Sequence, residues 1–259
     1  MISVVNVSHH FGLRPVLRHV NLQVQAGELV CVMGPNGTGK TTLMHVMAGL
    51  LSPMQGYVEI NGLRRKRTAH DELEIRRQVT WLPADPWLPP SKTGREWLLI
   101  NGRVYGVSYD RLMEHIPRLL SLFNLEEQAD QRIPAYSTGQ KKKLALAAAL
   151  VTEAPILLLD EPFSGGLDPS GILALKRIFQ RHRERRDVTV VMATPVPELV
   201  EELSDRVAVI REGRLVAFDT VAGLRRQAGV EGRLDEIYER LVSPDTAQKV
   251  ERYFREVKP

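Results

Sequence analysis

The sequence predicts an α/β fold with a mostly parallel core sheet, an N-terminal antiparallel β part and an inserted α-helical subdomain. Three observations lead to this fold class. Continuous apolar runs at 28–33, 156–160 and 188–192 are typical of strands buried on both faces of a parallel sheet. Between about 92 and 152, apolar residues recur at helical spacing instead. Two further strand-like runs before residue 28 are assigned to the antiparallel part.

Each expected strand is a short apolar run bounded by turn residues. In chain order we expect strands at 3–8, 19–25, 28–33, 57–61, 78–82, 156–160, 188–192, 207–211 and 214–218. The pair Glu212–Gly213 between the last two is a hairpin signal. Helices are expected at 41–51, within 92–152, and between the strands that end at 160 and begin at 188.

The chain is divided into two parts by its composition. Residues 1–225 are expected to form one domain, with the helical subdomain at about 92–152 inserted into it. Residues 226–259 are charged and are expected to form a helical C-terminal tail. Leu234, Ile237 and Leu241 make a short apolar stripe there, which we expect to pack onto the domain rather than bind a partner.

The overall composition is that of an ordinary globular protein, with 43% hydrophobic and 25% charged residues in 259. The one cysteine, Cys31, lies in the apolar run LVCVM, so it forms no intrachain disulfide and is expected to be buried and inert. The first residues lack the features of a signal peptide, and no apolar stretch reaches about 18 residues. We therefore expect a cytoplasmic protein.

The net charge of +4 includes basic runs at 64–67, 141–143 and 181–186. Aromatic residues are not interleaved with these runs, as they would be in an RNA-binding surface. Solvated helix faces and turns account for such runs, so we expect no nucleic-acid partner.

A glycine-rich loop follows the strand at 28–33 and reads GPNGTGKT. It matches the phosphate-binding loop of P-loop NTPases in full. Glycines let the backbone turn its N–H groups toward phosphate oxygens, and the following helix offers its N-terminus to the same anion. Lys40 is expected to contact the β- and γ-phosphates, and Thr41 to bind Mg²⁺. The predicted phosphate-binding residues are Gly34, Pro35, Asn36, Gly37, Thr38, Gly39, Lys40, Thr41 and Thr42.

Two acidic residues end the buried strand ILLLD at the edge of the sheet where such folds bind ligands. Asp160 is expected to hold Mg²⁺, directly or through water. Glu161 comes next and points differently, because side chains alternate along a strand. A carboxylate beside the γ-phosphate can orient and deprotonate the attacking water, so Glu161 is the predicted catalytic base.

A second anion site is predicted at the start of the helix that follows YSTGQ. Ser137 is the expected N-cap of that helix, and the small residues Thr138 and Gly139 leave backbone N–H groups accessible. This helix lies in the helical subdomain, away from the phosphate loop. Two chains packed head to tail would enclose one nucleotide between the loop of one chain and the helix start of the other.

These motifs, in their order and spacing, resemble the ATP-binding cassette (ABC) family of transporter ATPases over residues 1 to about 225. YSTGQ resembles the family signature, FSGGLDP resembles the loop after the acidic strand, and Phe11 matches the aromatic residue that stacks on adenine. The resemblance implies that ATP is also contacted by Phe11, Ser137, Gly139, Gln140 and Asp168.

The segments WLLINGRVYGV, LFNLEEQADQRIPAYSTGQKKKLALAAAL and LDEIYERL are similar to the cassettes of ABC-2 type exporters. This resemblance implies an ATP hydrolase that dimerises, as a homodimer or heterodimer, around ATP and Mg²⁺. It would lie peripherally at the cytoplasmic face of the membrane and drive separate transmembrane permease subunits. The cargo would be set by those subunits.

Two positions depart from the family pattern. Ala84 stands where the family has a glutamine that contacts Mg²⁺ and the attacking water, and a methyl group can do neither. Asp85, the next residue, would reach the ion only if the loop slipped by one position. Pro195 stands where the family has a histidine that donates to the γ-phosphate. We expect Pro195 in the first turn of the acidic helix that follows, where proline is well tolerated.

The two departures leave three interpretations open. The first is a transporter motor with normal ATP binding and slow hydrolysis, because one lost transition-state contact costs about 100-fold in rate. The second is a regulatory cassette that binds ATP without hydrolysis beside a competent partner cassette. The third, a soluble cassette acting on DNA or ribosomes, is disfavoured because the chain lacks long insertions and a nucleic-acid pattern.

Trp87, beside Ala84, is expected either at a permease contact or in simple packing.

Overall fold

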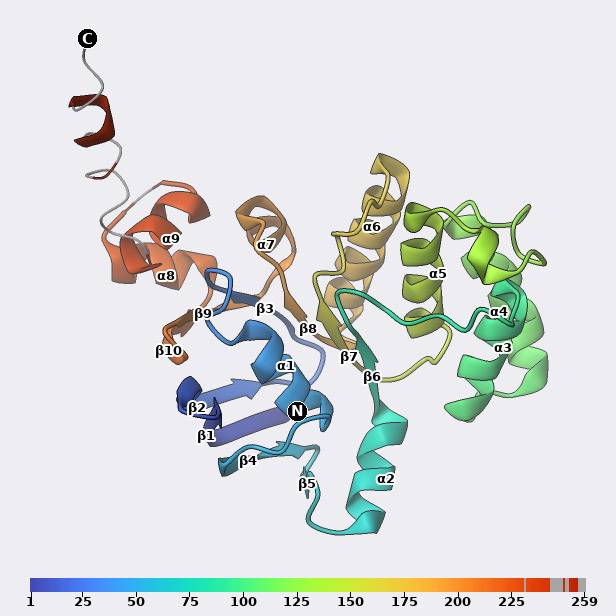
Figure 1. The fold of residues 1–259 in the computed structure, drawn as a ribbon, viewed down its shortest axis with the longest axis horizontal. Coiled ribbons are helices and arrows are strands. Elements are labelled where there is room, and N and C mark those ends of the chain that lie inside the picture. Colours follow the sequence, from blue (N-terminus) through green and yellow to red (C-terminus); the bar gives the residue numbers. More distant parts are fainter. Residues whose placement is uncertain (231, 243–248, 250–251, 256–259) are drawn as a thin grey trace.

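Two β-sheets and the helices around them form the body of the molecule (Figure 1). The computed structural model describes residues 1–230, 232–242, 249 and 252–255. The antiparallel sheet has the order β2-β1-β4-β5, and its strands are β1 (Ile2–Phe11), β2 (Arg14–Val24), β4 (Gln55–Ile60) and β5 (Leu63–Arg64). β1 and β2 form a hairpin that turns at Gly12, so the second strand begins earlier than predicted.

The larger sheet has the order β10-β9-β3-β8-β7-β6. Its strands are β3 (Leu29–Met33), β6 (Val79–Leu82), β7 (Ile156–Asp160), β8 (Thr189–Ala193), β9 (Arg206–Arg211) and β10 (Arg214–Asp219). All neighbouring pairs are parallel except β9 and β10. Glu212 and Gly213 both have positive φ angles of 50° and 77° at the β9–β10 turn, which confirms the predicted hairpin.

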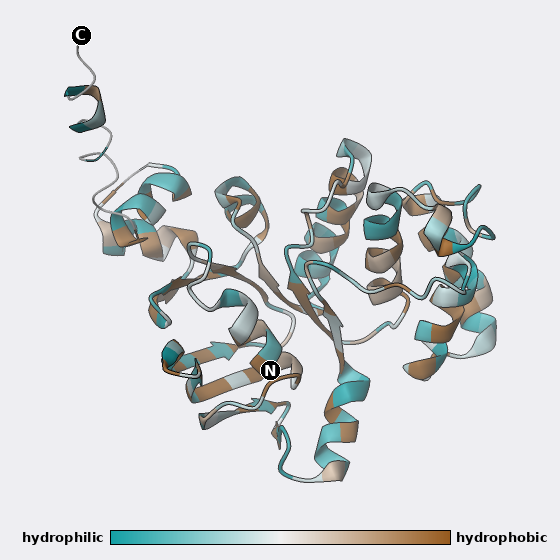
Figure 2. Cartoon of the chain, viewed as in Figure 1, coloured by the Kyte–Doolittle hydropathy of each residue, from teal (hydrophilic) through white to brown (hydrophobic). Residues whose placement is uncertain are grey.

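Helix α1 (Lys40–Ala48) packs between the two sheets, and α6 (Pro169–Arg185) and α7 (Pro197–Leu203) lie on the opposite side of the parallel sheet (Figure 1). Alternate residues of β3 show the two cores: Leu29, Cys31 and Met33 join one apolar cluster. Val30 and Val32 join the other, beneath the antiparallel sheet. Both faces of the parallel sheet are therefore buried, as the continuous apolar runs predicted (Figure 2).

The segment between β6 and β7 is helical. It contains α3 (Gly94–Val104), α4 (Tyr109–Leu122), a 3₁₀ turn (Ile133–Ala135) and α5 (Thr138–Leu150). These helices pack beside the sheet and extend the molecule at the end remote from β10 (Figure 1). The division of the chain at 92–152 and at 225 stays a prediction, because a run of helices does not by itself define a separately folding unit.

One helix was not predicted. α2 (Ala69–Gln78) is strongly polar, and only Ile75 among its residues is buried, so the sequence carries little helical periodicity there. Its N-cap Thr68 accepts a hydrogen bond from the backbone N–H of Asp71, and basic residues occupy its last turn. Local capping and charge placement therefore stabilise α2 more than burial does.

The last described helices are α8 (Val221–Ala228) and α9 (Leu234–Val242). Leu234 and Ile237 are buried against the body, and Leu241 is partly buried there, which confirms that this stripe packs onto the domain. The predicted helical tail at 226–259 includes residues that lie outside the described part of the chain. Among the described residues, no helix combines the length and apolar character needed to cross a membrane.

Candidate functional site

Four parallel strands lead into the phosphate loop and the loops of Ala84, Glu161 and Pro195 at one edge of the sheet. Val32 of β3 pairs with Ala193 of β8, and Ala193 pairs with Asp160 of β7. On the far side of β7, Leu82 of β6 pairs with Leu159. The loops that follow these strands therefore start side by side at the carboxyl edge, where open α/β sheets bind ligands.

The phosphate loop runs from Gly34 after β3 into α1, and three of its glycines have positive φ. At Gly39, φ is 105°, and a Cβ there would lie 2.6 Å from the carbonyl oxygen of Val16. Gly39 is also the N-cap of α1 and has no side chain, so the first N–H groups of the helix face outward uncapped. This geometry is the one that an anion-binding helix start requires.

Lys40 folds back over its own loop. Its ammonium donates to the carbonyl oxygens of Gly34 at 2.7 Å and Pro35 at 3.0 Å. Burial lowers the pKa of Lys40, while the negative charges of Glu161 and Asp160 act in the opposite direction. Phosphate oxygens would accept the same N–H groups more strongly than carbonyl oxygens do, because the hydrogen bond would then join two charges.

Thr41 and Asp160 are brought together from α1 and β7. The hydroxyl of Thr41 donates to Oδ2 of Asp160 at 2.8 Å. A hydroxyl and a carboxylate side by side are hard oxygen donors of the kind Mg²⁺ prefers, so these two residues fit a magnesium ion. Among the described residues, no group of three or more histidine, cysteine and acidic side chains could hold a metal alone.

The predicted catalytic residue, Glu161, lies in the same hollow as the phosphate loop. This hollow has a volume of about 470 Å³. Its lining includes the following predicted residues: Phe11, Asn36, Gly37, Gly39, Lys40, Thr41, Thr42 and Glu161. Gly34, Pro35 and Thr38 belong to the same loop but do not line this hollow. The Thr38 hydroxyl donates to the Pro35 carbonyl at 2.8 Å within the loop.

Arg14 and Val16 also line this hollow and were not predicted. Arg14 begins β2 just after the hairpin turn, and its guanidinium lies 3.9 Å from the position a Cβ would take at Gly37. A basic residue three positions after Phe11 was the available signal. Its relevance depends on the hairpin turn at Gly12, which returns the chain to the loop.

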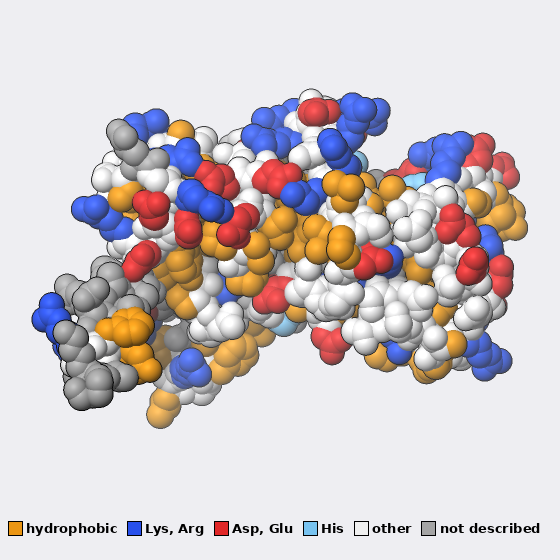
Figure 3. Space-filling model, turned by 90° about the horizontal axis from the view of Figure 1, so that it is seen from above, with side chains coloured by type: hydrophobic (Ala, Val, Ile, Leu, Met, Phe, Trp, Pro, Cys, Tyr) orange, Lys and Arg blue, Asp and Glu red, His pale blue; other side chains and the backbone are white. Residues whose placement is uncertain are grey.

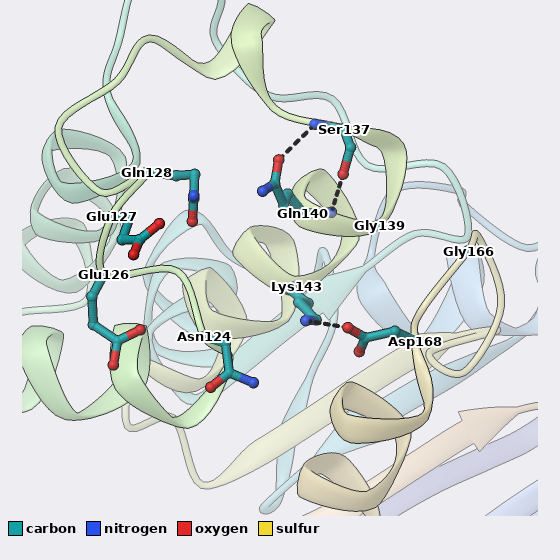
Figure 4. A pocket seen from close by; sticks show the side chains of 10 residues that line it. All are labelled: Asn124, Glu126, Glu127, Gln128, Ser137, Gly139, Gln140, Lys143, Gly166 and Asp168. Atoms are coloured by element: carbon teal, nitrogen blue, oxygen red, sulfur yellow. Dashed lines mark hydrogen bonds and ion pairs between the residues drawn. The ribbon is translucent and has the colours of Figure 1, made fainter.

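A second hollow, of about 820 Å³, lies at the start of α5 (Figure 4). Ser137, Gly139, Gln140 and Asp168 line it together, and their contact with ATP stays a prediction. Ser137 is the N-cap of α5, as predicted: its hydroxyl accepts from the Gln140 N–H at 3.2 Å, and the Gln140 side chain accepts from the Ser137 N–H at 2.8 Å. This reciprocal capping leaves the remaining first-turn N–H groups facing the hollow.

Lys143 lies at the floor of this second hollow and was not predicted. Its buried ammonium donates to Asp168 at 2.8 Å, joining α5 to the N-terminus of α6 (Figure 4). Asp168 itself caps α6 by accepting from the Gly171 N–H at 2.8 Å. The linings of the two hollows have no described residue in common, so these hollows, each of them a predicted half-site, are separate within one chain.

Ala84 and Pro195 lie at the same carboxyl edge, in the loops after β6 and β8. Pro195 is exposed and precedes α7, whose first residue is Pro197, so the expectation that Pro195 takes the first helical turn was wrong. Pro197 occupies that position instead, because Val196 is extended and acts as the N-cap. Asp85 is exposed beside Ala84 and is not part of the lining of the phosphate-loop hollow.

The fold and this edge define an ATP-binding cassette. The family model described as "ABC transporter" matches residues 17–164. The ABC-type transporter ATP-binding protein EcsA of Bacillus subtilis is 30% identical over 252 residues, which cover 96% of this chain and 99% of that protein. The chain therefore belongs to the ABC transporter family, as an ATP-binding subunit.

Other similar proteins and solved structures are also ATP-binding subunits or cassettes of ABC transporters. The Nod factor export ATP-binding protein I of Burkholderia lata is 37% identical over 214 residues, covering 82% of this chain and 68% of that protein. A solved ATP-binding subunit of an ABC transporter superposes with a TM-score of 0.86 at 32% identity, covering 93% and 99% of the two chains. A dimeric cassette in a post-hydrolysis state with ADP and Pi has a TM-score of 0.76 at 26% identity, over 85% of this chain and 99% of that one.

Proposed function

We propose that this chain is the motor subunit of an exporter: it dimerises around MgATP, hydrolyses it slowly and drives separate transmembrane permease subunits from the cytoplasmic face of the membrane. Residues 1–225 would form the ATP-binding domain, with the helices at about 92–152 inserted, and 226–259 its tail. The observation that carries the proposal is the pair of separate half-sites. Neither hollow alone surrounds a nucleotide with both the phosphate loop and the capped start of α5.

The chemistry would be divided among the residues at the carboxyl edge. Lys40 would exchange its contacts with Gly34 and Pro35 for phosphate oxygens. Thr41 and Asp160 would hold Mg²⁺, which when bound with ATP neutralises charge on the phosphates. Glu161, in the same hollow, would accept a proton from the water that attacks the γ-phosphate. Phe11 would stack on adenine.

The half-site at α5 would complete the pocket of a second chain. The backbone N–H groups of Ser137 and Gln140 are used in the capping box, so those of Thr138 and Gly139 would stabilise an anion at this helix N-terminus. A phosphate from the nucleotide on the other chain fits this chemistry. The dimeric cassettes among the solved relatives support such pairing, with either a second copy or a different cassette.

Hydrolysis is proposed to be slow because two side chains at the carboxyl edge offer no polar group. Ala84 has only a methyl group, and Pro195 has neither a side-chain donor nor an N–H. Losing one transition-state contact costs about 100-fold in rate, and the loss of two is not additive. ATP binding, which rests on the phosphate loop and Phe11, should stay near normal.

The permease is proposed to dock beside Ala84. A groove of about 260 Å³ lies between β6 and the helices α3 and α5, lined by Trp81, Trp87 and Trp97 among others. Trp87 is 73% exposed and meets Trp97 edge-on, with ring centroids 6.5 Å apart. This exposure favours a partner contact over simple packing, because aromatic side chains are enriched at interfaces.

The test compares the steady-state ATPase activity of the chain, with its permease, to that of Glu161→Gln. We expect measurable wild-type activity and a loss of about 100-fold or more in the variant, because the general base is removed. The control is equilibrium binding of MgATP, and the affinities of the wild type and the variant should be alike. Equal, idle rates would reject the motor proposal for this site.

That outcome would favour the second candidate, a regulatory cassette that binds ATP beside a competent partner cassette. The observation in its favour is the same pair, Ala84 and Pro195, at the carboxyl edge. Rates equal to those of a fully equipped cassette would instead reject the claim that these two residues slow the reaction.

A further inference from the structure

Lys142 is a buried lysine that the proposed reaction does not use. It lies in α5, between Lys141 and Lys143, and only 3% of it is exposed. Its ammonium donates to the carbonyl oxygen of Ala84 at 3.1 Å and to that of Glu161 at 3.1 Å. One side chain of the helical segment is thus hydrogen-bonded to two loops at the carboxyl edge of the sheet.

The backbone of Glu161 is held in an unusual conformation at this point. Its φ is 46°, in the left-handed region that residues with a Cβ seldom adopt. Its N–H donates to the carbonyl of Ala193 at 2.8 Å, and its own carbonyl accepts from both the N–H and the hydroxyl of Ser164, at 3.1 and 2.9 Å. Lys142 supplies a further donor to that carbonyl, from outside the loop.

The loop after β6 is held differently. Ala84 has no polar side chain, and its carbonyl oxygen is the group that accepts the hydrogen bond from Lys142. The same ammonium also donates to the carbonyl of Glu161. Ala84 and Glu161 are far apart in sequence, but they follow β6 and β7, which are neighbours in the sheet. Lys142 therefore fixes the spacing between the Ala84 loop and the base.

Burial of a cation needs compensation. Burial lowers the pKa of Lys142, and the nearby negative charges of Glu161, Asp160 and Asp85 oppose that effect. The aliphatic part of the side chain passes Gly165, where a Cβ would lie 3.5 Å from the Lys142 Cδ. Both the aliphatic part and the ammonium of the lysine are therefore shielded from solvent, with Gly165, Ala84 and Glu161 among their neighbours.

We propose that Lys142 is a positioning residue for hydrolysis: by bonding the carbonyls of Ala84 and Glu161 together, it holds the catalytic carboxylate in place and couples α5 to the loop that carries Trp87. This inference rests on the proposed function for its effect on rate. Its structural part, the joining of two loops, is independent of hydrolysis.

The test uses the full chain and four variants. Lys142→Met removes every donor while keeping most of the side-chain volume, and Lys142→Arg keeps both donors and charge. Lys142→Gln keeps an N–H donor on a side chain too short to reach both carbonyls, and serves if the methionine variant does not fold. Lys141→Met is the matched control, since Lys141 is the adjacent, partly exposed lysine of the same helix.

Hydrogen exchange followed by mass spectrometry reports on the loops directly. In Lys142→Met, peptides covering 83–92 and 161–166 should both exchange about fivefold faster or more, because opening of each loop loses a restraining bond. ATPase activity should fall about 10- to 100-fold in kcat, with KM and MgATP affinity within about threefold of wild type. Lys142→Arg should recover most of both effects, and Lys141→Met should change neither.

Unchanged exchange in either peptide would overturn the proposal, because the lysine would then not join the two loops. Faster exchange with unchanged kcat would overturn the positioning role. If the wild-type chain proved inactive, the motor proposal would fail, and the exchange data would still decide whether Lys142 joins the loops.

Discussion

Pro195 is proposed to stand where a side-chain donor would reach the γ-phosphate. It lies two residues after Ala193, the last residue of β8, whose carbonyl accepts from the Glu161 N–H. We expect Pro195→His to raise kcat by about 10- to 100-fold, because it adds one transition-state contact. MgATP affinity should change little. The measurement is steady-state ATPase activity, with Pro195→Ala as the control that removes the ring without adding a donor.

Phe11 is a second residue whose role can be isolated. It is 55% exposed at the tip of the β1–β2 hairpin and lines the phosphate-loop hollow. Phe11→Ala should weaken MgATP binding about two- to tenfold, the value of one stacked aromatic pair. Leu13→Ala is the matched control, since Leu13 is fully exposed at the same tip. An equal effect of both variants, measured by equilibrium binding, would contradict stacking by Phe11.

At the scale of the element, α6 depends on the cap at Asp168. Asp168→Ala should lower the free energy of unfolding by about 1 kcal/mol at neutral pH, because the Gly171 N–H in the first turn of α6 loses its acceptor. Asp168→Asn keeps the cap and should cost less. Urea denaturation of the two variants measures the difference.

The same cap predicts a pH dependence. The Lys143 ammonium, followed by the Gly171 N–H, holds the pKa of Asp168 below its ordinary value of 3.8. The charged form is therefore favoured in the folded state, so its contribution is present above 3.8 and lost as the pH falls through the lower folded pKa. The contribution is small because Asp168 is half exposed. Wild type should lose this increment in acid, while Asp168→Asn should not.

At the scale of the whole molecule, the two half-sites predict complementation between chains. Lys40→Met should disable the phosphate loop, and Ser137→Ala should disable the other half-site, so each homodimer should be idle. A mixed dimer keeps one pocket with both halves intact. Mixing the two variants should therefore restore roughly a quarter of wild-type ATPase activity, for random pairing with one live pocket in half of the dimers.

The absence of recovery in that mixture would show that the pockets are not shared between copies of this chain. Because Ser137→Ala also removes the N-cap of α5, its folding should be checked by thermal denaturation. On the face seen in Figure 3, acidic and basic side chains are interspersed rather than gathered into one patch of a single sign.

Most of the fold could be predicted from the sequence. Buried parallel strands appear in it as continuous apolar runs, and the hairpin at Glu212–Gly213 has residues typical of a turn. It also placed the phosphate loop and Asp160, whose residue types follow from the chemistry of phosphate and magnesium. Helix α2 escaped prediction because its stability is local and polar. The contacts of Arg14, Lys142 and Lys143 could not be predicted, because they join elements that are distant in sequence.

All three tryptophans of the chain gather around the groove beside Ala84. Intrinsic fluorescence therefore samples one small region rather than the whole protein. Quenching or a spectral shift on adding MgATP would report movement of the loop after β6, and a shift on adding permease would report dehydration of Trp87. The tryptophan fluorescence of the unlabelled protein can therefore report on the region where the chain is proposed to contact its permease.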